Sequence, residues 1–201
     1  MIEIKICGVT RMADVELCVD LGVEALGLNF WPRSPRCVDA DFARRVRDAF
    51  PQLELVGVFV NPSSETLRTF REQAGLNALQ LHGDESPDFV RAHACAYKAV
   101  PVASEADVAH ALSFGERILV DAPAGALRGG AGETFDWTLV AGLSAKRHVT
   151  LAGGLRSTNV SLAIEVARPA RVDVASGVES APGVKDSAKL RAFVEAVRAH
   201  R

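Results

Sequence analysis

The chain has 201 residues, of which 48% are hydrophobic, and its formal net charge at pH 7 is −2. This length suits a single domain over residues 1–201 with a sizeable buried core. The near-neutral charge argues against bulk electrostatic binding of nucleic acid or of an anionic membrane surface, whereas a local phosphate site stays open because such sites use backbone amides.

Eight short apolar runs of strand length recur along the chain, and each is rich in branched or aliphatic residues. They occupy residues 2–7, 25–30, 53–60, 78–82, 96–100, 117–122, 148–153 and 171–177. Segments with helical periodicity lie between most of them, at residues 11–22, 39–50, 63–75, 86–94, 104–115 and 187–200. Several of these segments begin with Ser or Asp, which can cap a first helical turn, and Gly22 is suited to ending the first helix.

This alternation predicts a parallel sheet built from about eight strand–helix units of roughly 25 residues each, close to the minimum for such a unit. Eight units favour an α/β fold of the closed (β/α)8 TIM barrel type. A doubly wound open sheet is the structural alternative, but it usually has fewer strands, and no GxGxxG follows the first run.

Active sites of such barrels lie at the carboxyl ends of the strands. Because side chains alternate along a strand, Lys5 and Cys7 are predicted to point into the barrel, with Cys7 nearer the rim. By the same reasoning, Gln80, His82 and Asp173 are predicted to point inward. Asp121 ends its own apolar run. A single inward aspartate could be structural, but buried charges are costly, so the whole set predicts a functional site.

Two glycine-containing turns follow the last two strands. Gly153 and Gly154 end the seventh strand, while Ser176 and Gly177 end the eighth. Glycine lets the backbone approach a ligand closely, and these two loops are the usual phosphate site of this fold. Either pair alone could instead belong to an ordinary turn without a ligand.

Two more loops contribute candidate residues. The glycine-rich segment 121–137 is long enough for a lid, although plain disorder is an alternative, and Phe135 and Trp137 are expected to anchor its far end in the core. Arg36 follows the second strand and could hold a carboxylate through two parallel hydrogen bonds. Arg33 competes with Arg36 for this role, and either could be a surface charge.

The four cysteines include no CxxC pair and no zinc-ligand spacing with histidine, so we expect reduced thiols in a cytoplasmic protein without metal or cofactor. Cys18, Cys37 and Cys95 carry no predicted role, and His93, His110, His148 and His200 are expected on surfaces or loops. Charges at Glu3 and Lys5 interrupt the first apolar run, so no signal peptide is predicted, and no stretch of about 18 apolar residues predicts a membrane span.

Several motifs in their order along the chain resemble the phosphoribosylanthranilate isomerases of tryptophan biosynthesis. These motifs are KICGVTR, FWPRSPR, VGVFVN, LQLHGDE, LVDA, GGAGETFDW, LAGGL and VDVASGVE followed by PGVKD, and they extend from Ile4 to about Asp186. The resemblance implies a cofactor-free (β/α)8 barrel that converts N-(5-phosphoribosyl)anthranilate into 1-(2-carboxyphenylamino)-1-deoxyribulose 5-phosphate. It also implies a phosphorylated aminosugar as the small-molecule partner, with no nucleic acid or membrane, and a monomer or homodimer.

The resemblance also implies roles for individual residues. Cys7 matches the general base, Asp121 the general acid, and Arg36 the residue that holds the anthranilate carboxylate. The LAGGL and ASGV turns match the phosphate site, and Asp173 matches an acidic residue beside it. Independently of the resemblance, the inward position of His82 at a strand end predicts a supporting role towards the substrate or a proton transfer, with a simple hydrogen bond within the rim as the alternative. Glu133 departs from the basic residue that many relatives carry there.

These residue types raise a chemical difficulty. Free cysteine has a pKa of about 8.5 and aspartate of about 3.9, so near pH 7 their resting forms are the reverse of a base and an acid. We expect Lys5 to lower the thiol pKa, and burial together with Asp173 to raise that of Asp121. Two rival functions are another sugar-phosphate enzyme on the same scaffold, such as an epimerase or a lyase, and a phosphate binder without catalysis.

Overall fold

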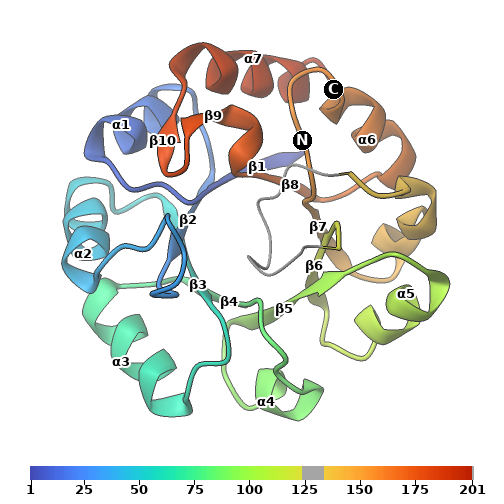
Figure 1. Cartoon of the computed structure of the whole chain (residues 1–201), viewed down its shortest axis with the longest axis horizontal. Coiled ribbons are helices and arrows are strands. Elements are labelled where there is room, and N and C mark those ends of the chain that lie inside the picture. Colours follow the sequence, from blue (N-terminus) through green and yellow to red (C-terminus); the bar gives the residue numbers. More distant parts are fainter. Residues whose placement is uncertain (124–133, 201) are drawn as a thin grey trace.

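Eight parallel strands close into a barrel, and the helices form a ring outside it (Figure 1). The computed structural model describes residues 1–123 and 134–200. The strands are β1 (Glu3–Cys7), β2 (Ala25–Asn29), β3 (Glu54–Phe59), β4 (Ala78–Leu81), β5 (Ala96–Pro101), β6 (Arg117–Asp121), β7 (His148–Leu151) and β8 (Arg171–Val174). Each strand pairs with the next along the chain, and β8 pairs with β1 to complete the circle. The predicted closed barrel is therefore confirmed, and the open-sheet alternative is excluded.

The helices are α1 (Met12–Asp20), α2 (Ala40–Ala49), α3 (Ser64–Ala74), α4 (Pro87–Arg91), α5 (Glu105–Ala111), α6 (Val160–Ala167) and α7 (Ser187–Arg198). Side-chain oxygens of Asp39, Ser63, Ser86 and Asp186 accept hydrogen bonds from first-turn amides, as the predicted caps require. Gly22 follows α1 with a φ of +68°, a conformation that favours glycine. Helix α4 is shorter than the predicted segment 86–94.

Two regions differ from the regular strand–helix alternation. Between β6 and β7 the described residues form two 3-10 helices, η1 (Trp137–Val140) and η2 (Leu143–Ala145), in place of an eighth α-helix. Gly142, with a φ of +79°, separates them and prevents one continuous helix. After β8 the chain forms η3 (Ser176–Val178) and then a hairpin of β9 (Glu179–Ala181) and β10 (Val184–Lys185), which the sequence analysis did not predict.

The core has two layers because strand side chains alternate. Ile4 and Ile6 of β1 belong to the large cluster between strands and helices. A smaller cluster, comprising Val56, Ala78, Tyr97, Ala99, Leu119 and Ala152, comes from alternate positions of the barrel strands. Phe135 and Trp137 pack against the large cluster, as expected for the end of the loop after β6.

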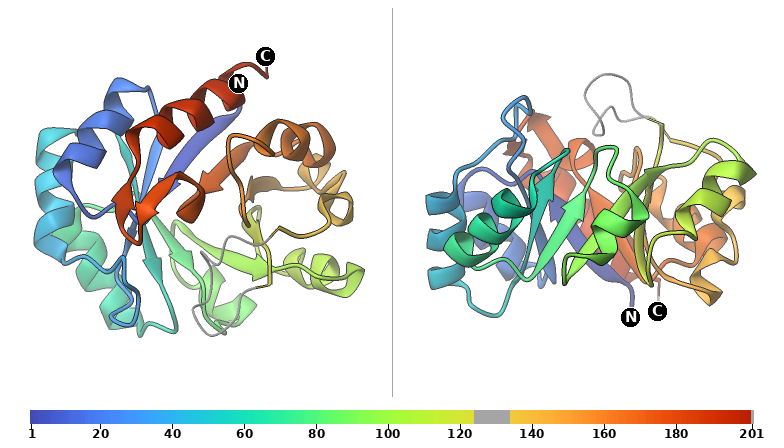
Figure 2. Two further views of the ribbon diagram at one scale, coloured as in Figure 1. Left: turned by 45° about the horizontal axis from the view of Figure 1, so that its top comes forward. Right: turned by 90° about the horizontal axis from the view of Figure 1, so that it is seen from below.

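The amino-terminal end of the barrel is closed by charged side chains. Arg171 donates to Glu3 and Glu54, with an Nη2–Oε2 distance of 2.5 Å to each carboxylate. Arg117 pairs with Glu54 and lies 4.3 Å from the ring centre of Tyr97. The two ends of the chain lie side by side (Figure 2), where Arg198 Nη1 donates to the Ile2 carbonyl at 3.1 Å. Among the residues described, no helix is long and apolar enough to cross a membrane.

Candidate active site

Inward side chains of β1, β4, β5 and β8 meet in one polar network inside the barrel. The buried Lys5 ammonium donates to Gln80 Oε1 at 2.9 Å and to Asp173 Oδ2 at 2.8 Å. Tyr97 donates its hydroxyl to the same Gln80 oxygen at 3.1 Å. Burial disfavours the Lys5 ammonium, but Asp173 and, less strongly, Cys7 and Tyr97 outweigh this effect and raise its pKa. The predicted inward direction of Lys5, Gln80 and Asp173 is confirmed.

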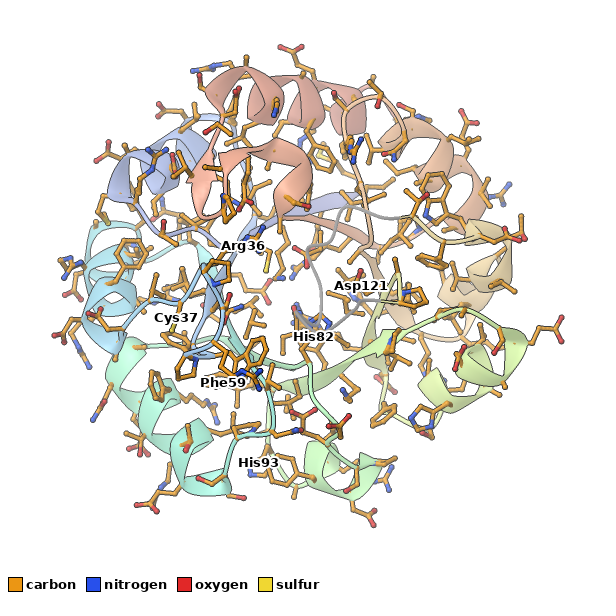
Figure 3. The ribbon with its side chains drawn as sticks, viewed as in Figure 1. Arg36, Cys37, Phe59, His82, His93 and Asp121 are labelled. Carbon is orange, nitrogen blue, oxygen red and sulfur yellow. The ribbon has the colours of Figure 1, made fainter. Side chains whose placement is uncertain are left out.

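The network continues to the ends of β4 and β6. Gln80 Nε2 lies 3.4 Å from His82 Nδ1, and His82 Nε2 lies 3.6 Å from Asp121 Oδ2. Figure 3 shows His82 and Asp121 facing the centre of the barrel mouth, with Arg36 on the same face, whereas His93 lies outside the ring of strands. The structure thus brings together the candidates that the sequence placed on separate strands.

Asp121 has the electrostatics of an acid that is protonated near neutrality. Its pKa is raised from 3.8 to about 7, first because burial disfavours the carboxylate and second because of the negative charge of Asp173. The Ala122 amide, which donates to Asp121 Oδ1 at 2.8 Å, and Lys5 oppose the rise without cancelling it. The expectation that burial and Asp173 raise this pKa is therefore confirmed.

Cys7 ends β1 opposite Gly27 of β2, and its side chain is partly exposed. A Cβ atom added at Gly27 would lie 2.6 Å from Cys7 Sγ, so glycine leaves the space that the thiol occupies. Burial raises the pKa of Cys7, and Asp173 adds to the rise, whereas the charges of Lys5 and Lys185 lower it. The predicted lowering effect of Lys5 is confirmed, but the pKa of Cys7 is raised overall because desolvation is the larger effect.

Arg36 lies at the mouth in a geometry fixed by Glu179. Its Nε atom lies 3.0 and 3.3 Å from the two Glu179 oxygens, and Nη2 donates to Oε2 at 2.7 Å. A Cβ atom added at Gly8 would overlap the Arg36 side chain, so the arginine passes directly over the end of β1. Arg33 is exposed and lies 5.5 Å from the ring centre of Trp31. Arg36 is thus the better placed of the two candidates for a carboxylate.

The turns after β7 and β8 touch each other through a glycine. A Cβ atom added at Gly177 would overlap the Leu155 carbonyl oxygen, so only glycine permits this close packing. Gly153 and Gly154 have φ values of +88° and +60°, which favour glycine. Asn159 fixes the first turn by donating to the Gly154 carbonyl at 3.0 Å and accepting from the Arg156 amide at 2.8 Å. The two turns that are predicted to bind phosphate therefore lie in contact.

Sequence reasoning gave no role to two charged residues of the β9–β10 hairpin, Glu179 and Lys185. The Lys185 ammonium donates to the Cys7 carbonyl at 2.6 Å and to Glu179 Oε1 at 2.8 Å. A weak signal existed, because both residues stand within the motifs VDVASGVE and PGVKD. Periodicity could not assign them, since the hairpin strands have only three and two residues.

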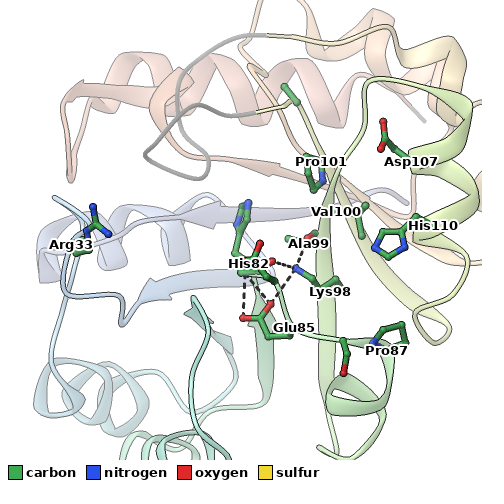
Figure 4. A pocket seen from close by; sticks show the side chains of 14 residues that line it. Arg33, His82, Glu85, Pro87, Lys98, Ala99, Val100, Pro101, Asp107 and His110 are labelled. Carbon is green, nitrogen blue, oxygen red and sulfur yellow. Dashed lines mark hydrogen bonds and ion pairs between the residues drawn. The ribbon is translucent and has the colours of Figure 1, made fainter.

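A cleft of about 810 Å³ opens beside this site at the ends of β4 and β5 (Figure 4). Its lining includes His82, Ala122, Lys98 and Glu85, and the charged atoms of Lys98 and Glu85 lie 3.2 Å apart. The lining reaches Ala122, the residue that directly follows Asp121. The cleft lies away from the turns after β7 and β8, so one elongated molecule would have to span both regions.

The remaining candidates lie outside the site. Cys18 is buried on α1, and Cys37 and Cys95 are exposed. His110 and His148 are exposed, whereas His93 and His200 are half-buried away from the mouth. Among the described residues, no group of three or more His, Cys, Asp or Glu could hold a metal ion. Glu133 and most of the predicted lid, residues 124–133, lie outside the described residues.

Residues 4–196 match a family model described as N-(5'phosphoribosyl)anthranilate (PRA) isomerase. An N-(5'-phosphoribosyl)anthranilate isomerase from Myxococcus xanthus is 45% identical to the chain, covering 98% of the chain and 96% of the relative.

Solved structures of the same kind are also similar. One describes mutually generated monomers of the dimeric phosphoribosylanthranilate isomerase from Thermotoga maritima; it has a TM-score of 0.89 and 37% identity, and covers 99% of this chain and 100% of its own. Another phosphoribosyl anthranilate isomerase was solved in complex with reduced 1-(o-carboxyphenylamino)-1-deoxyribulose 5-phosphate; it has a TM-score of 0.88 and 37% identity, with the same coverage.

Proposed function

Because the chain belongs to the N-(5'-phosphoribosyl)anthranilate isomerase family, we propose that Cys7 and Asp121 carry out the two proton transfers of its reaction. The chain converts N-(5-phosphoribosyl)anthranilate into 1-(2-carboxyphenylamino)-1-deoxyribulose 5-phosphate, the third step from chorismate to tryptophan. This Amadori rearrangement turns an aldose derivative into a ketose derivative, so it needs one general acid and one general base.

Asp121 is the acid, and the observation that carries this assignment is its pKa of about 7 in a buried position at the barrel mouth. About half of the molecules therefore hold the proton at neutral pH. Asp121 gives it to the ribose ring oxygen, the ring bond to C1 breaks, and a Schiff base with the anthranilate nitrogen forms. His82, at 3.6 Å, supports the acid from the cleft side.

Cys7 is the base, which removes the proton from C2 of the Schiff base. The resulting enolamine rearranges to the ketone of the product, with no change in overall composition. Cys7 and Asp121 both stand at carboxyl ends of barrel strands, β1 and β6, so they reach one bound molecule from two sides. The raised thiol pKa makes Cys7 a stronger base once it is ionised.

The rest of the site binds the two ends of the substrate. Glu179 accepts from Nε and Nη2 of Arg36. Nη1 makes no hydrogen bond within the described part of the chain, so the Nη1 side of the guanidinium can hold the anthranilate carboxylate. The turns at Gly153–Gly154 and Ser176–Gly177 bind the 5′-phosphate through backbone amides. The complexed relative holds a ligand of this class, with a carboxyphenyl group at one end and a phosphate at the other.

Turnover of phosphoribosylanthranilate by the purified chain is the test, run beside Cys7→Ala and Asp121→Asn. We expect each substitution to lower kcat by at least about 100-fold, as loss of an acid or a base does, while circular dichroism shows an intact fold. A wild-type chain without turnover would contradict the activity. Turnover retained by either folded variant would contradict the role of that residue.

We also propose a compartment, an assembly and a domain count for the chain. A cytoplasmic enzyme with four reduced thiols fits the absence of disulfides among the described cysteines. The Thermotoga maritima relative is described as dimeric and as monomers, and a monomer or a homodimer is proposed for this chain. One domain spans residues 1–201, since β1 and β8 complete the same barrel.

A further inference from the structure

The buried ammonium of Lys185 joins two parts of the site that lie far apart in sequence. Its side chain has no exposed surface. Nζ donates to the carbonyl of Cys7 at 2.6 Å, to the carbonyl of Ala175 at 3.3 Å and to Glu179 Oε1 at 2.8 Å. An ammonium has three donors, so these three contacts satisfy it completely. Lys185 thereby ties the last residue of β1 to the residue directly before the Ser176–Gly177 turn.

The backbone of Lys185 is fixed as firmly as its side chain. Its amide donates to Asp14 Oδ2 at 3.2 Å, and its carbonyl accepts from Arg11 Nη2 at 3.3 Å. Arg11 and Asp14 pair with each other at 2.6 Å on the first turn of α1. A two-stranded hairpin is marginally stable alone, and here charged contacts to α1 and β1 define its position.

Glu179 extends the same contacts to Arg36. Its carboxylate accepts from Lys185, from Arg36 and from the Gly183 amide at 3.2 Å. Only 4% of the Glu179 side chain is exposed, and a buried carboxylate without partners would be strongly unfavourable. Lys185 therefore balances the charge that orients Arg36.

Four charged groups face Cys7 from the elements around it. Lys5 lies on the same strand, Asp173 on β8, Lys185 on β10, and Arg36 in the loop after β2. Lys5 is already neutralised by Asp173 at 2.8 Å, and Arg36 by Glu179. Lys185 shares Glu179 with Arg36, so this trio keeps a net positive charge that favours the Cys7 thiolate.

We propose that Lys185 is a positioning residue of the isomerisation, which fixes the base Cys7 against the phosphate turn and, through Glu179, orients Arg36 for the substrate carboxylate. The inference rests on the roles proposed above for Cys7 and Arg36. Lys185 itself touches backbone carbonyls and Glu179, so its effect reaches the reaction through these neighbours.

The chain offers a matched control in Lys98 of β5. Lys98 is also buried, it donates to the carbonyls of Leu81, Gly83 and Ala99, and it pairs with Glu85. Lys98→Met and Lys185→Met therefore remove the same kind of buried, fully bonded ammonium at different strand ends. A purely structural lysine would give the same result at both positions.

The experiment measures Cys7 alkylation by iodoacetamide against pH, together with kcat, KM and thermal unfolding. A Cys37→Ser/Cys95→Ser background removes the two exposed thiols, and peptide mass spectrometry separates Cys7 from the buried Cys18. We expect Lys185→Met to shift the alkylation midpoint to higher pH and to lower kcat/KM on the order of 100-fold, as misplacement of a reacting group does. Lys98→Met should lower the unfolding temperature similarly and leave the alkylation midpoint unchanged.

An unchanged alkylation midpoint in Lys185→Met, with a fall in unfolding temperature like that of Lys98→Met, would overturn the inference. Lys185→Arg is the second variant if Lys185→Met does not fold. It keeps the charge, but its planar guanidinium cannot reproduce the three contacts, so kcat/KM should still fall, and wild-type kcat/KM would overturn the inference. A wild-type chain without isomerase activity would refute the proposed function, while the alkylation comparison would still decide the effect of Lys185 on Cys7.

Discussion

In the proposed mechanism, the protonation of two side chains, Asp121 and Cys7, decides how much of the enzyme is ready to react. The productive form needs a protonated Asp121 and an ionised Cys7. Because the Asp121 pKa is about 7 and that of Cys7 is raised above its ordinary value, the productive form is a minority at every pH. The apparent pKa values belong to the pair, and kcat/KM should rise through about pH 7 and fall above the Cys7 pKa.

Asp173 connects both titrations, because its charge raises the pKa of Asp121 and of Cys7. Asp173→Asn removes that charge and retains an acceptor for Lys5. We therefore expect both limbs of the kcat/KM profile to move to lower pH. Asp20→Asn, at the exposed end of α1, is the control and should leave the profile in place. A profile unchanged in Asp173→Asn would show that Asp173 does not act on these two groups.

Asp121 should also lower stability, since burial raises its pKa from 3.8 to about 7. A folded chain that holds the proton more tightly than the unfolded chain loses stability as pH rises from about 4 to 7. The shift corresponds to about 4 kcal/mol at pH 8. Asp121→Asn removes this cost, so its unfolding temperature should exceed that of the wild type at pH 8 and match it at pH 4. An equal difference at both pH values would exclude the electrostatic cause.

At the scale of elements, the placement of the two proposed phosphate turns depends on the contact between Gly177 and the Leu155 carbonyl. Gly177→Ala forces these turns apart, because the added Cβ would overlap backbone. We expect KM to rise about 10-fold or more, and competitive inhibition by inorganic phosphate to weaken, since a phosphate site depends on the placement of its amides. Gly115→Ala is the control, because a Cβ there meets nothing within 4 Å. Unchanged phosphate inhibition in Gly177→Ala would remove this turn from the phosphate site.

The predictable elements are those that a period of two or 3.6 residues defines. The alternation in β1 was enough to predict that Lys5 and Cys7 point inward. When the isoleucines of the strand pack against the helices, the side chains between them must face the barrel interior. The hairpin could not be predicted, since its strands are too short for a pattern and its contacts with β1 and α1 span more than 170 residues. The net direction of the Cys7 pKa depended on burial, which sequence does not measure.

At the scale of the whole molecule, a charge cluster that stabilises the barrel and the candidate active site lie at opposite ends of the barrel. The charges of Glu3, Glu54, Arg117 and Arg171 close the amino-terminal end, and the site occupies the opposite end. Arg171→Met leaves two carboxylates without their shared partner in a partly buried position. We expect this variant to lose roughly 2–3 kcal/mol of unfolding free energy in urea denaturation, with kcat/KM at 25 °C within a few-fold of the wild type. A collapse of kcat/KM in a folded variant would contradict this separation.

The pairing of β1 with β8 makes barrel closure depend on both halves of the polypeptide. During synthesis on a ribosome, β1 emerges first and has only β2 beside it until the last strand is translated. The other edge of β1, the strand that carries Cys7, stays unpaired until then, and unpaired strand edges make folding intermediates prone to aggregation. The Cys7 thiol is thus among the last groups to be packed in the newly synthesised chain.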